Sequence, residues 1–442
     1  MSSLKETPAW FQYPRFNWKH KQATVIGGGI AGAQAAWHLC QKGWQVTLIE
    51  RHKTLATEAS GNPAGVLSPK MTAIPSEGED FYTRSFHYTL SLLKTLKQQG
   101  QSIDWEACGV LQLAHSPREI KRWQSLKERG LSKDFIQLLD NKQTTAVSGV
   151  GLPYKASYFP HGGWIKPASF VKALASHPNC SIIYQSLALS LNKTDKNWQV
   201  LDADNRVIAE SDAVIIANGK DLFQFKQSDF LPGLAVAGQT TTASTLGYSK
   251  KLKTVIGHEG YLTPLIRHNA SNTKGVTKGG AKEVTKKHIF GATFERGIQN
   301  PTLEQSADYC NFTNLQLYLP NLANALTDIN SAHTAVRMTT PDRFPYVGGL
   351  PEKAFYQESY HDLHQGKQWK EYPKAKYQDG LFVLGSLGSR GLITSGYCAK
   401  SLVALIENNV GAVNNKETDL VLKQCHPARF LIKDLKKNRT IF

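Results

Sequence analysis

The chain has 442 residues, of which 41% are hydrophobic, and a formal net charge of +17 at pH 7. This length allows two or three domains, and no uninterrupted apolar run approaches the ~18 residues of a membrane-spanning helix, so we expect no membrane partner. The six cysteines are scattered without a CxxC pair, which argues against a disulfide framework or a zinc site and predicts a cytoplasmic protein. The positive charge has two interpretations, a generally basic surface or a polyanionic partner, for which nucleic acid is the first candidate.

Residues 1–22 have the character of an arm rather than of a domain. Their aromatic residues follow neither a helical nor a strand period, so we expect them to pack on the domain that follows. We expect no further catalytic domain within an arm of this length.

The next stretch, residues 23–50, has the order of a dinucleotide-binding unit. An apolar strand at 23–26 is followed by a glycine turn, a helical pattern and a second strand at 46–49 that ends in an acid. In such units the first glycine permits a tight turn, the second lets a pyrophosphate approach the backbone, and the third lets the helix pack on the strand. The acid lies 18 residues after the third glycine, close to the ~20 expected of a residue that binds a ribose hydroxyl. These four residues are Gly27, Gly29, Gly32 and Glu50.

Further elements follow in chain order. Residues 58–69 are rich in small residues and turn formers and predict a loop, whose backbone can pass close to a flat cofactor. We then expect a helix at 81–99, a strand at 109–114, a charged helix at 117–130, a turn flanked by aromatic residues at 158–165 and a hairpin at 197–209. Residues 212–219 predict a buried strand ending at a glycine, and such a strand returns to the nucleotide sheet with its carboxyl end at the cofactor.

The C-terminal half differs in character. Residues 220–330 predict several short strands separated by polar loops. These strands are expected at 254–256, 260–263 and 288–292. Residues 381–392 repeat the order of strand, glycine turn and helix, and the basic tail at 429–439 predicts a short helix.

One loop, residues 272–287, carries five lysines against a single acid. Two interpretations remain open for it, a solvated insertion or a contact with nucleic acid. Its lysines are Lys274, Lys278, Lys282, Lys286 and Lys287.

Six segments together resemble the D-amino-acid-oxidase-type (DAO) flavoprotein family, and more narrowly the FAD-dependent oxidoreductase domain of MnmC-type enzymes, which modify the wobble uridine of tRNA. The segments are IGGGIAGA with Glu50, ASGNPAGVLSP, YFPHGGWIKPA, DAVIIANG, RMTTPDRFPYVGGLP and LFVLGSLGSRGL, in that order over nearly the whole chain. ASGN-x-x-G and LGSLGSRGL point to the MnmC branch rather than to oxidases of free amino acids. Two departures stand out: we expect no upstream methyltransferase domain here, and the lysine-rich loop is longer than the pattern of the family.

The resemblance implies an α/β fold, with a Rossmann-like FAD-binding domain of the D-amino-acid-oxidase/glutathione-reductase type and a mainly antiparallel α+β substrate domain. We expect a discontinuous FAD-binding domain at 23–80, 150–220 and 331–442, a substrate domain at 81–149 and 221–330, and the arm at 1–22. FAD is the implied cofactor, bound non-covalently. The residues implied to bind it are Gly27, Gly29, Gly32, Glu50, Ser60, Gly61, Asn62, Gly65, Asn218, Gly219, Gly385, Gly388, Ser389, Arg390, Gly391 and Leu392.

The implied reaction takes a hydride from the glycine-like methylene of 5-carboxymethylaminomethyl-(2-thio)uridine, and hydrolysis of the imine then gives 5-aminomethyl-(2-thio)uridine and glyoxylate. A deprotonated secondary amine can lose hydride directly to a flavin, so neither a protein nucleophile nor a metal is needed. The carboxylate must be held, for which the planar fork of an arginine is well suited. The resemblance assigns this role to Arg337 and places Arg390 beside the flavin. Alternatively, Arg337 forms a structural ion pair and Arg390 contacts only flavin or backbone; His161 and Tyr261 either line the pocket or are structural.

Three functions remain in view: a tRNA-modifying flavin oxidase, a glycine- or sarcosine-type oxidase of a free small amine, and a non-catalytic flavin protein that binds RNA. The net charge and the basic tail favour the first over the second, and the two arginines disfavour the third. We therefore expect the anticodon stem-loop of tRNA as partner, a separate SAM-dependent methyltransferase as a further candidate, and a monomeric protein. The phosphates would be held by the lysines of 274–287 and by Lys433, Lys436, Lys437 and Arg439.

Overall fold

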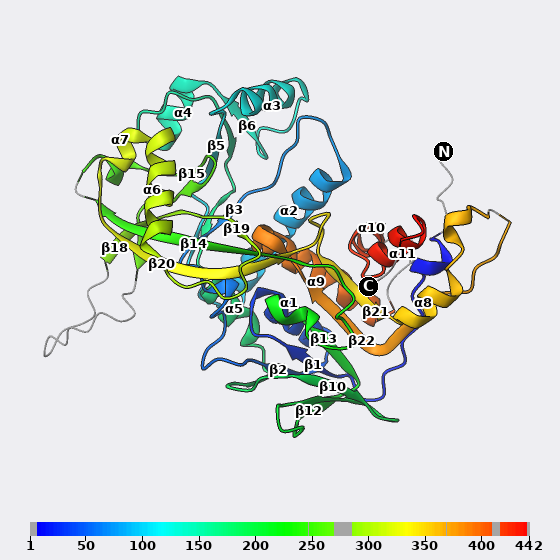
Figure 1. Cartoon of the computed structure of the whole chain (residues 1–442). Helices are drawn as coiled ribbons and strands as arrows, with labels where there is room; N and C mark the ends of the chain where they lie inside the picture. The colour runs from blue at the N-terminus through cyan, green and yellow to red at the C-terminus, as the bar shows by residue number, and fades with distance from the viewer. Residues whose placement is uncertain (1–6, 246, 269–284, 368, 409–415, 440–442) are drawn as a thin grey trace, which may run out of the picture. The chain divides into compact units, whose positions relative to one another are not determined.

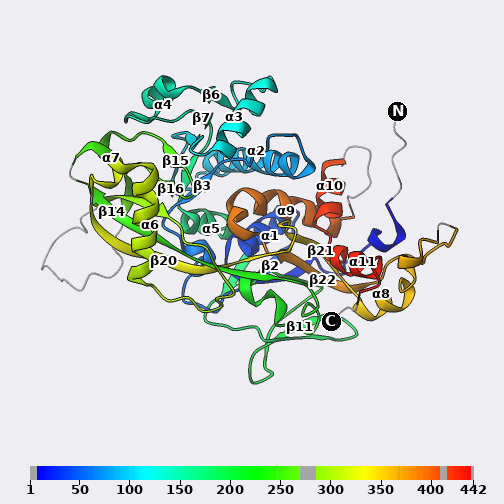
Figure 2. The same cartoon turned by 45° about the horizontal axis from the view of Figure 1, so that its top comes forward.

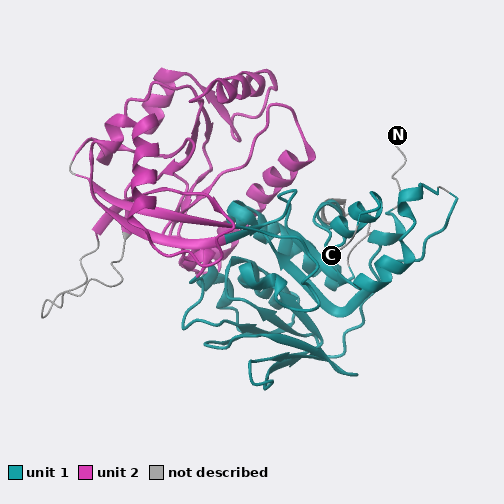
Figure 3. Ribbon diagram, in the orientation of Figure 1, with its two compact units in different colours: residues 1–57, 171–235, 337–442 teal, residues 58–170, 236–336 magenta. Residues whose placement is uncertain are grey.

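The computed structural model describes residues 7–245, 247–268, 285–367, 369–408 and 416–439. The chain forms two compact units, each built from separate stretches (Figure 3). Unit 1 comprises 1–57, 171–235 and 337–442, and unit 2 comprises 58–170 and 236–336.

These boundaries differ from the predicted domains in four stretches. Residues 58–80, 150–170 and 331–336, predicted with the FAD-binding domain, lie in unit 2, and residues 221–235, predicted with the substrate domain, lie in unit 1. The first two stretches are joined to each other because strands β3 (Gly65–Leu67) and β8 (Gly163–Ile165) pair in an antiparallel ladder.

Unit 1 is built on a six-stranded sheet in the order β21-β22-β13-β1-β2-β9. Neighbouring strands are parallel except β21 and β22, which are antiparallel. The strands are β1 (Gln22–Ile26), β2 (Gln45–Ile49), β9 (Cys180–Ile183), β13 (Ala213–Ile216), β21 (Tyr346–Pro351) and β22 (Tyr377–Gly385). The apolar runs of β1 and β13 are buried, as strands covered on both faces require, which confirms both as core strands.

Helices α1 (Ile30–Cys40) and α9 (Gly391–Ile406) pack on this sheet and on each other (Figures 1 and 2). Fully buried alanines at positions 33, 35 and 36 of α1 allow the close approach. Both predicted units of strand, glycine turn and helix are thereby confirmed, the second as β22, the 3₁₀ turn η6 (Gly388–Arg390) and α9.

The rest of unit 1 surrounds this sheet. A small antiparallel sheet confirms the predicted hairpin. Its strands are β10 (Ser190–Lys193), β11 (Trp198–Leu201) and β12 (Val207–Ser211), and the remaining elements include η1 (Ala9–Phe11), η3 (Gly219–Phe223), α8 (Lys353–Ser359), η5 (Leu363–Gln365), α10 (Lys416–Gln424) and α11 (Arg429–Leu435). The N-terminal arm packs its aromatic residues on this region, as expected, because Trp10, Phe11 and Tyr13 join the cluster around Tyr356 and Tyr377.

Unit 2 contains a ten-stranded sheet in the order β19-β14-β18-β16-β15-β5-β7-β6, with β17 beside β18 and β20 beside β14. Its register-assigned pairs are antiparallel apart from β5 with β15, which confirms the mainly antiparallel prediction. The strands are β5 (Val110–Leu113), β6 (Gln137–Leu139), β7 (Ala156–Phe159), β14 (Leu234–Thr245), β15 (Val255–Gly257), β16 (Tyr261–Leu262), β17 (Ile266–His268), β18 (Thr285–Gly291), β19 (Glu295–Arg296) and β20 (Leu326–Thr339).

A second sheet and the following helices, of which α5 continues into unit 1 at Val171, complete the described part of unit 2. The sheet has the order β3-β8-β4, with β4 at Trp105–Glu106. The helices are α2 (Glu77–Gln98), α3 (Pro117–Glu128), α4 (Asn141–Ser148), α5 (Pro167–Ala175), α6 (Gln305–Tyr318) and α7 (Pro320–Ala323). No helix in the described ranges is both long and apolar enough to cross a bilayer.

Candidate active site

The turn after β1 accepts only glycine at two of its three motif positions. Gly27 has φ +108°, and a Cβ there would lie 2.6 Å from the Cα of Asn218. A Cβ on Gly32 would lie 1.8 Å from the carbonyl oxygen of Gly27. Gly29 is the N-cap of α1 and supplies no side-chain cap, and the positive end of the dipole of this eleven-residue helix favours an anion at the turn.

Glu50 fixes the same turn from the end of β2. Glu50 is only 6% exposed, and its Oε2 accepts a hydrogen bond from the N–H of Gly28 at 2.9 Å. Oε1 accepts from the N–H of His52 at 2.8 Å. Because each carboxylate oxygen has a second lone pair, Glu50 can hold these two backbone groups and still accept from a ribose hydroxyl.

Two buried side-chain oxygens lie just beyond the carboxyl ends of neighbouring parallel strands. Asn218 follows β13, and its Nδ2 donates to the carbonyl of Asp221 at 3.1 Å while its Oδ1 has no partner among the described residues. Ser386 directly follows β22 with φ +54°, and its Oγ also lacks a partner there. Ligands of open α/β sheets bind at this edge, so two buried oxygens left without partners fit a polar cofactor at this position.

The second glycine turn connects β22 to α9. Gly388 has φ +58°, and Arg390 is the N-cap residue of α9. A Cβ on Gly391 would lie 3.6 Å from a methyl carbon of Ile30 in α1, so the N-terminal turns of both helices are neighbours.

The structure brings the strand of Arg337 to the turn that carries Arg390. Arg337 is half-buried on β20, and Thr339, two residues later, forms an isolated antiparallel bridge with Leu387. The last residues of β20, from Arg337 on, belong to unit 1, so both arginines lie in unit 1, on segments joined by a backbone bridge.

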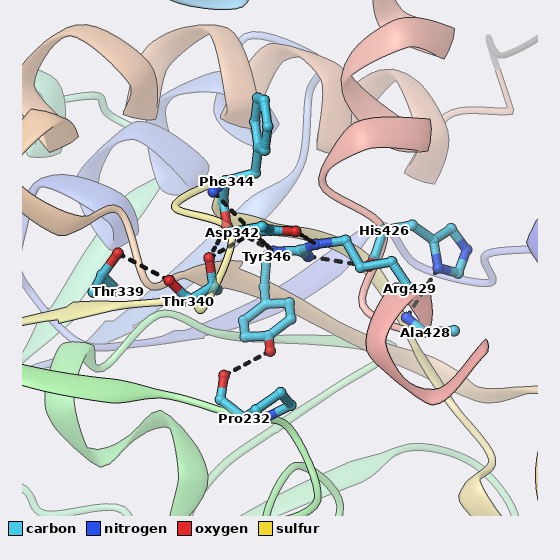
Figure 4. A network of polar contacts seen from close by, with 9 residues as sticks. All are labelled: Pro232, Thr339, Thr340, Asp342, Phe344, Tyr346, His426, Ala428 and Arg429. Carbon is cyan, nitrogen blue, oxygen red and sulfur yellow. Dashed lines mark hydrogen bonds and ion pairs between the residues drawn. The ribbon is translucent and has the colours of Figure 1, made fainter. Parts of the chain in front are cut away.

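A polar network follows Arg337 along the chain (Figure 4). Asp342 Oδ1 accepts from Thr340 Oγ1 at 2.8 Å and from the N–H of Phe344 at 3.0 Å. The guanidinium of Arg429 in α11 pairs with the same carboxylate, donates to the carbonyl of Phe344 at 2.7 Å and lies 4.7 Å from the ring centroid of Tyr346. Sequence reasoning missed this network, which fixes the loop from β20 to β21.

The predicted small-residue loop belongs to unit 2, where side chains from distant segments of the same unit hold it. Asn62 Nδ2 donates to the hydroxyl of Tyr261 at 3.3 Å, and Tyr261 donates to the carbonyl of Ala64 at 3.1 Å. Thr240 Oγ1 donates to Asn62 Oδ1 at 3.1 Å, and His333 contacts the carbonyl of Glu58 at 2.8 Å through Nε2. Tyr261 thus has a structural role in this loop.

The remaining predicted residues are distributed between the two units. Ser60 is buried in η2 (Ala59–Gly61), Gly65 begins β3, and His161 is exposed in the turn between β7 and β8. Lys274, Lys278 and Lys282 lie outside the described residues.

Fold and site together have the arrangement of a dinucleotide-binding protein, with glycine turns and buried oxygens at the carboxyl edge of a parallel sheet. The family model described as FAD dependent oxidoreductase (DAO) matches residues 22–405, and the chain belongs to this family. The buried oxygens at the strand ends, the glycine turns and Glu50 fit the FAD that the family implies.

Among known proteins the chain is similar to the tRNA 5-methylaminomethyl-2-thiouridine biosynthesis bifunctional proteins MnmC. It is 34% identical over 434 residues to the protein from Pseudomonas fluorescens, covering 96% of this chain and 61% of that protein. It is 32% identical over 432 residues to the protein from Chromobacterium violaceum, covering 96% and 62%. The chain therefore spans less than two thirds of the length of these relatives.

Two solved structures share the fold at low sequence identity. Glycine oxidase from Geobacillus kaustophilus has a TM-score of 0.67 at 18% identity, covering 88% of this chain and 95% of the oxidase. Iminodiacetate oxidase from Chelativorans has a TM-score of 0.62 at 20% identity, covering 87% and 95%.

Proposed function

We propose that this protein oxidises 5-carboxymethylaminomethyl-(2-thio)uridine at the tRNA wobble position to 5-aminomethyl-(2-thio)uridine and releases glyoxylate. The observation that carries the proposal is the similarity over 96% of the chain to proteins named for biosynthesis of a methylaminomethyl-thiouridine in tRNA. The proposed product lacks only a methyl group on nitrogen relative to the base in that name, so a SAM-dependent methyltransferase activity would complete it.

FAD, bound without a covalent link, would accept the hydride of this oxidation. The N-terminal turn of α1 would hold its pyrophosphate, and Glu50 its ribose. The buried oxygens of Asn218 and Ser386 would form hydrogen bonds with the cofactor, so we add Ser386 to the predicted residues.

Arg337 would bind the substrate carboxylate through two parallel N–H···O bonds and thereby aim the methylene at the flavin. The substrate loses a hydride from this carbon and a proton from its nitrogen. Water then adds to the resulting C=N carbon, and the C–N bond breaks to give glyoxylate and the aminomethyl group. Arg390, at the N-cap of α9, would lie beside the flavin.

The rival function is oxidation of a free small amine such as glycine or sarcosine. The two are separated by mixing the purified holoenzyme, without oxygen, with one of four candidates: tRNA carrying the carboxymethylaminomethyl group, tRNA lacking it, the isolated modified nucleoside, and glycine or sarcosine. Bleaching of the flavin absorbance only by the first tRNA, with one glyoxylate per flavin, supports the proposal. Equal or faster bleaching by the free amino acids, or by the isolated nucleoside, would replace it with the small-amine function.

A deletion strain gives the complementary test in cells. Nucleoside analysis of its tRNA should show accumulated carboxymethylaminomethyl-uridine, which a plasmid copy removes. Unchanged nucleoside composition would contradict the proposed substrate.

A further inference from the structure

One buried tyrosine ring joins three segments of unit 1. Tyr360 is 0% exposed and contacts the rings of Trp10, Phe355 and Tyr372, at centroid distances of 6.2, 5.9 and 6.0 Å. These rings come from η1 of the arm, from α8 and from the loop before β22. Together with α11 they form one hydrophobic cluster, and Figures 1 and 2 show η1, α8 and α11 side by side. The segments therefore hold each other in fixed positions.

A lysine ammonium group lies over the face of each of the three rings that contact Tyr360. The pairs are Lys436 over Trp10 at 4.8 Å, Lys376 over Phe355 at 5.0 Å and Lys370 over Tyr372 at 4.9 Å from Nζ to the ring centroid. A cation–π contact restrains a side chain that is otherwise highly flexible, so less entropy is lost when its ammonium group binds a ligand. The cluster thus presents three pre-positioned cations.

The carboxylates nearby neutralise only part of this charge. Lys370 donates to Asp362 at 2.7 Å, and Lys367 donates to it at 3.1 Å. In the part of the chain that the structure describes, neither Lys376 nor Lys436 forms an ion pair. Further exposed cations on the same segments are Lys374, Lys433, Lys437 and Arg439.

A solvent-exposed tryptophan is next to one of these lysines in the sequence. Trp369 precedes Lys370 and is 82% exposed, the highest value among the exposed large hydrophobic side chains that the structure describes. An exposed aromatic ring next to positive charges offers a flat surface for an unpaired base and cations for the adjoining phosphates.

We propose that these residues form an RNA-binding face, with Lys376 and Lys436 on backbone phosphates and Trp369 stacked on an unpaired base. The face comprises Trp369, Lys370, Lys374, Lys376, Lys433, Lys436 and Lys437. This inference deepens the proposed function, since the RNA would be the substrate tRNA. An acidic protein partner would satisfy the lysines but would make no use of the exposed indole.

The lysines are tested with the double variant Lys376→Ala/Lys436→Ala. Its matched control is Lys127→Ala/Lys155→Ala, which removes two exposed lysines stacked over Trp123 in unit 2 at 5.4 and 4.8 Å. The holoenzymes are titrated with a full-length tRNA transcript at several salt concentrations. The face variant should lose at least about tenfold in affinity at 0.1 M salt, and its slope of log affinity against log salt should flatten by about 1.4–1.8, while the control stays within about twofold. Wild-type affinity of the face variant, or an equal loss in the control, would overturn the proposal.

The indole is tested separately because stacking is insensitive to salt. Trp369→Ala should lower tRNA affinity by about 5- to 150-fold with an unchanged salt slope, and Trp369→Phe should retain most of the affinity. The control Tyr309→Ala removes an aromatic residue that is 72% exposed in unit 2. If Trp369→Ala binds tRNA with wild-type affinity, the proposed stacking contact is refuted.

Flavin reduction separates this inference from the proposed function. If tRNA binding depends on the face but modified tRNA leaves the flavin oxidised, the proposed reaction fails and the RNA-binding face stands. If modified tRNA reduces the flavin while the face variants bind tRNA like the wild type, the reaction stands and the face is refuted.

Discussion

Arg429 of the C-terminal helix holds Asp342 through two hydrogen bonds, from Nε to Oδ2 at 2.8 Å and from Nη2 to Oδ1 at 3.0 Å. The two residues are 87 positions apart in sequence, and the pair ties α11 to the loop that continues the strand of Arg337. A planar two-bond contact of this kind fixes orientation as well as distance.

Replacement of Asp342 by asparagine should destabilise the protein in a pH-dependent manner. Burial opposes ionisation of this carboxyl, but hydrogen bonds and charge from Arg429, with smaller contributions from Thr340 and Phe344, hold its pKa below the usual value. A depressed pKa stabilises the fold above the unfolded-state pKa of about 3.9 and ceases to do so as the pH falls through the folded value. Since the side chain is 36% exposed, we expect a loss of about 1–2 kcal/mol at pH 7.

Urea unfolding of wild type and Asp342→Asn measures this difference. It should be constant above about pH 5 and shrink below about pH 4. Asp379→Asn, at a side chain that is 82% exposed, is the control. A difference that persists unchanged at pH 3 would contradict the assigned role of the charge.

Glu50→Gln should weaken FAD retention and leave substrate affinity unchanged. The carboxylate of Glu50 accepts hydrogen bonds through both oxygens, from Gly28 and from His52. The amide of glutamine has only one accepting oxygen, because its nitrogen only donates, so it cannot replace both of these bonds and also accept from a ribose hydroxyl. Equilibrium dialysis against free FAD should show at least about a tenfold weaker affinity, given the ~1.5–3 kcal/mol of a hydrogen bond to a charged group. Glu407→Gln, an acid of the same unit that pairs with Lys21, serves as the control.

Arg337→Ala should keep FAD but lose most turnover. Removing one partner of a buried, charge-assisted pair to a carboxylate costs ~2–5 kcal/mol, or about 30- to 5,000-fold in kcat/KM. The exposed Arg343→Ala provides the comparison on the same loop. Near-normal flavin reduction by modified tRNA in Arg337→Ala would remove Arg337 from the substrate site.

FAD should be released on acid denaturation. The cysteines nearest in sequence to Arg337 on either side are Cys310, exposed on α6, and Cys398, buried in α9. Neither lies in an attachment context expected for flavin. After precipitation with trichloroacetic acid, the yellow colour should remain in the supernatant; colour retained in the pellet would show a covalent link.

Local patterns were sufficient to predict the nucleotide-binding half of the fold. The turn at Gly27 and the strand of Val214 and Ile215 follow from short-range rules, since steric limits and burial on both faces leave few residues possible there. The helix predicted at 117–130 is observed at Pro117–Glu128 because Ser116 caps it and proline begins it.

The long strands of unit 2 were harder to predict. β14 was not predicted, because its three consecutive threonines lack the alternation of a half-buried strand. In the structure their hydroxyls are satisfied by distant partners: Thr241 donates to Asp308 at 2.6 Å, and Thr242 to the carbonyl of Asn330 at 3.2 Å. Helix α6 was missed as well, since its apolar residues form no clear stripe.

The candidate site shows the same division. The glycines and Glu50 were predicted from spacing alone, whereas the side chains that support Asn62 and Asp342 come from residues 178 and 87 positions away. No local pattern encodes such pairings, because the fold creates them only when the strands and helices have assembled.

The hydrogen bonds from the N–H groups of Gly28 and His52 to Glu50 allow cofactor binding at this turn to be followed without any optical signal. The amide protons of Gly28 and His52 are held by one carboxylate, and they exchange with deuterium only when that contact opens. A nucleotide that engages Glu50 would make opening rarer and slow the exchange at both amides together. Mass-spectrometric deuterium uptake over this turn would therefore measure how much of the protein carries its cofactor, even in preparations too dilute or too turbid for absorbance.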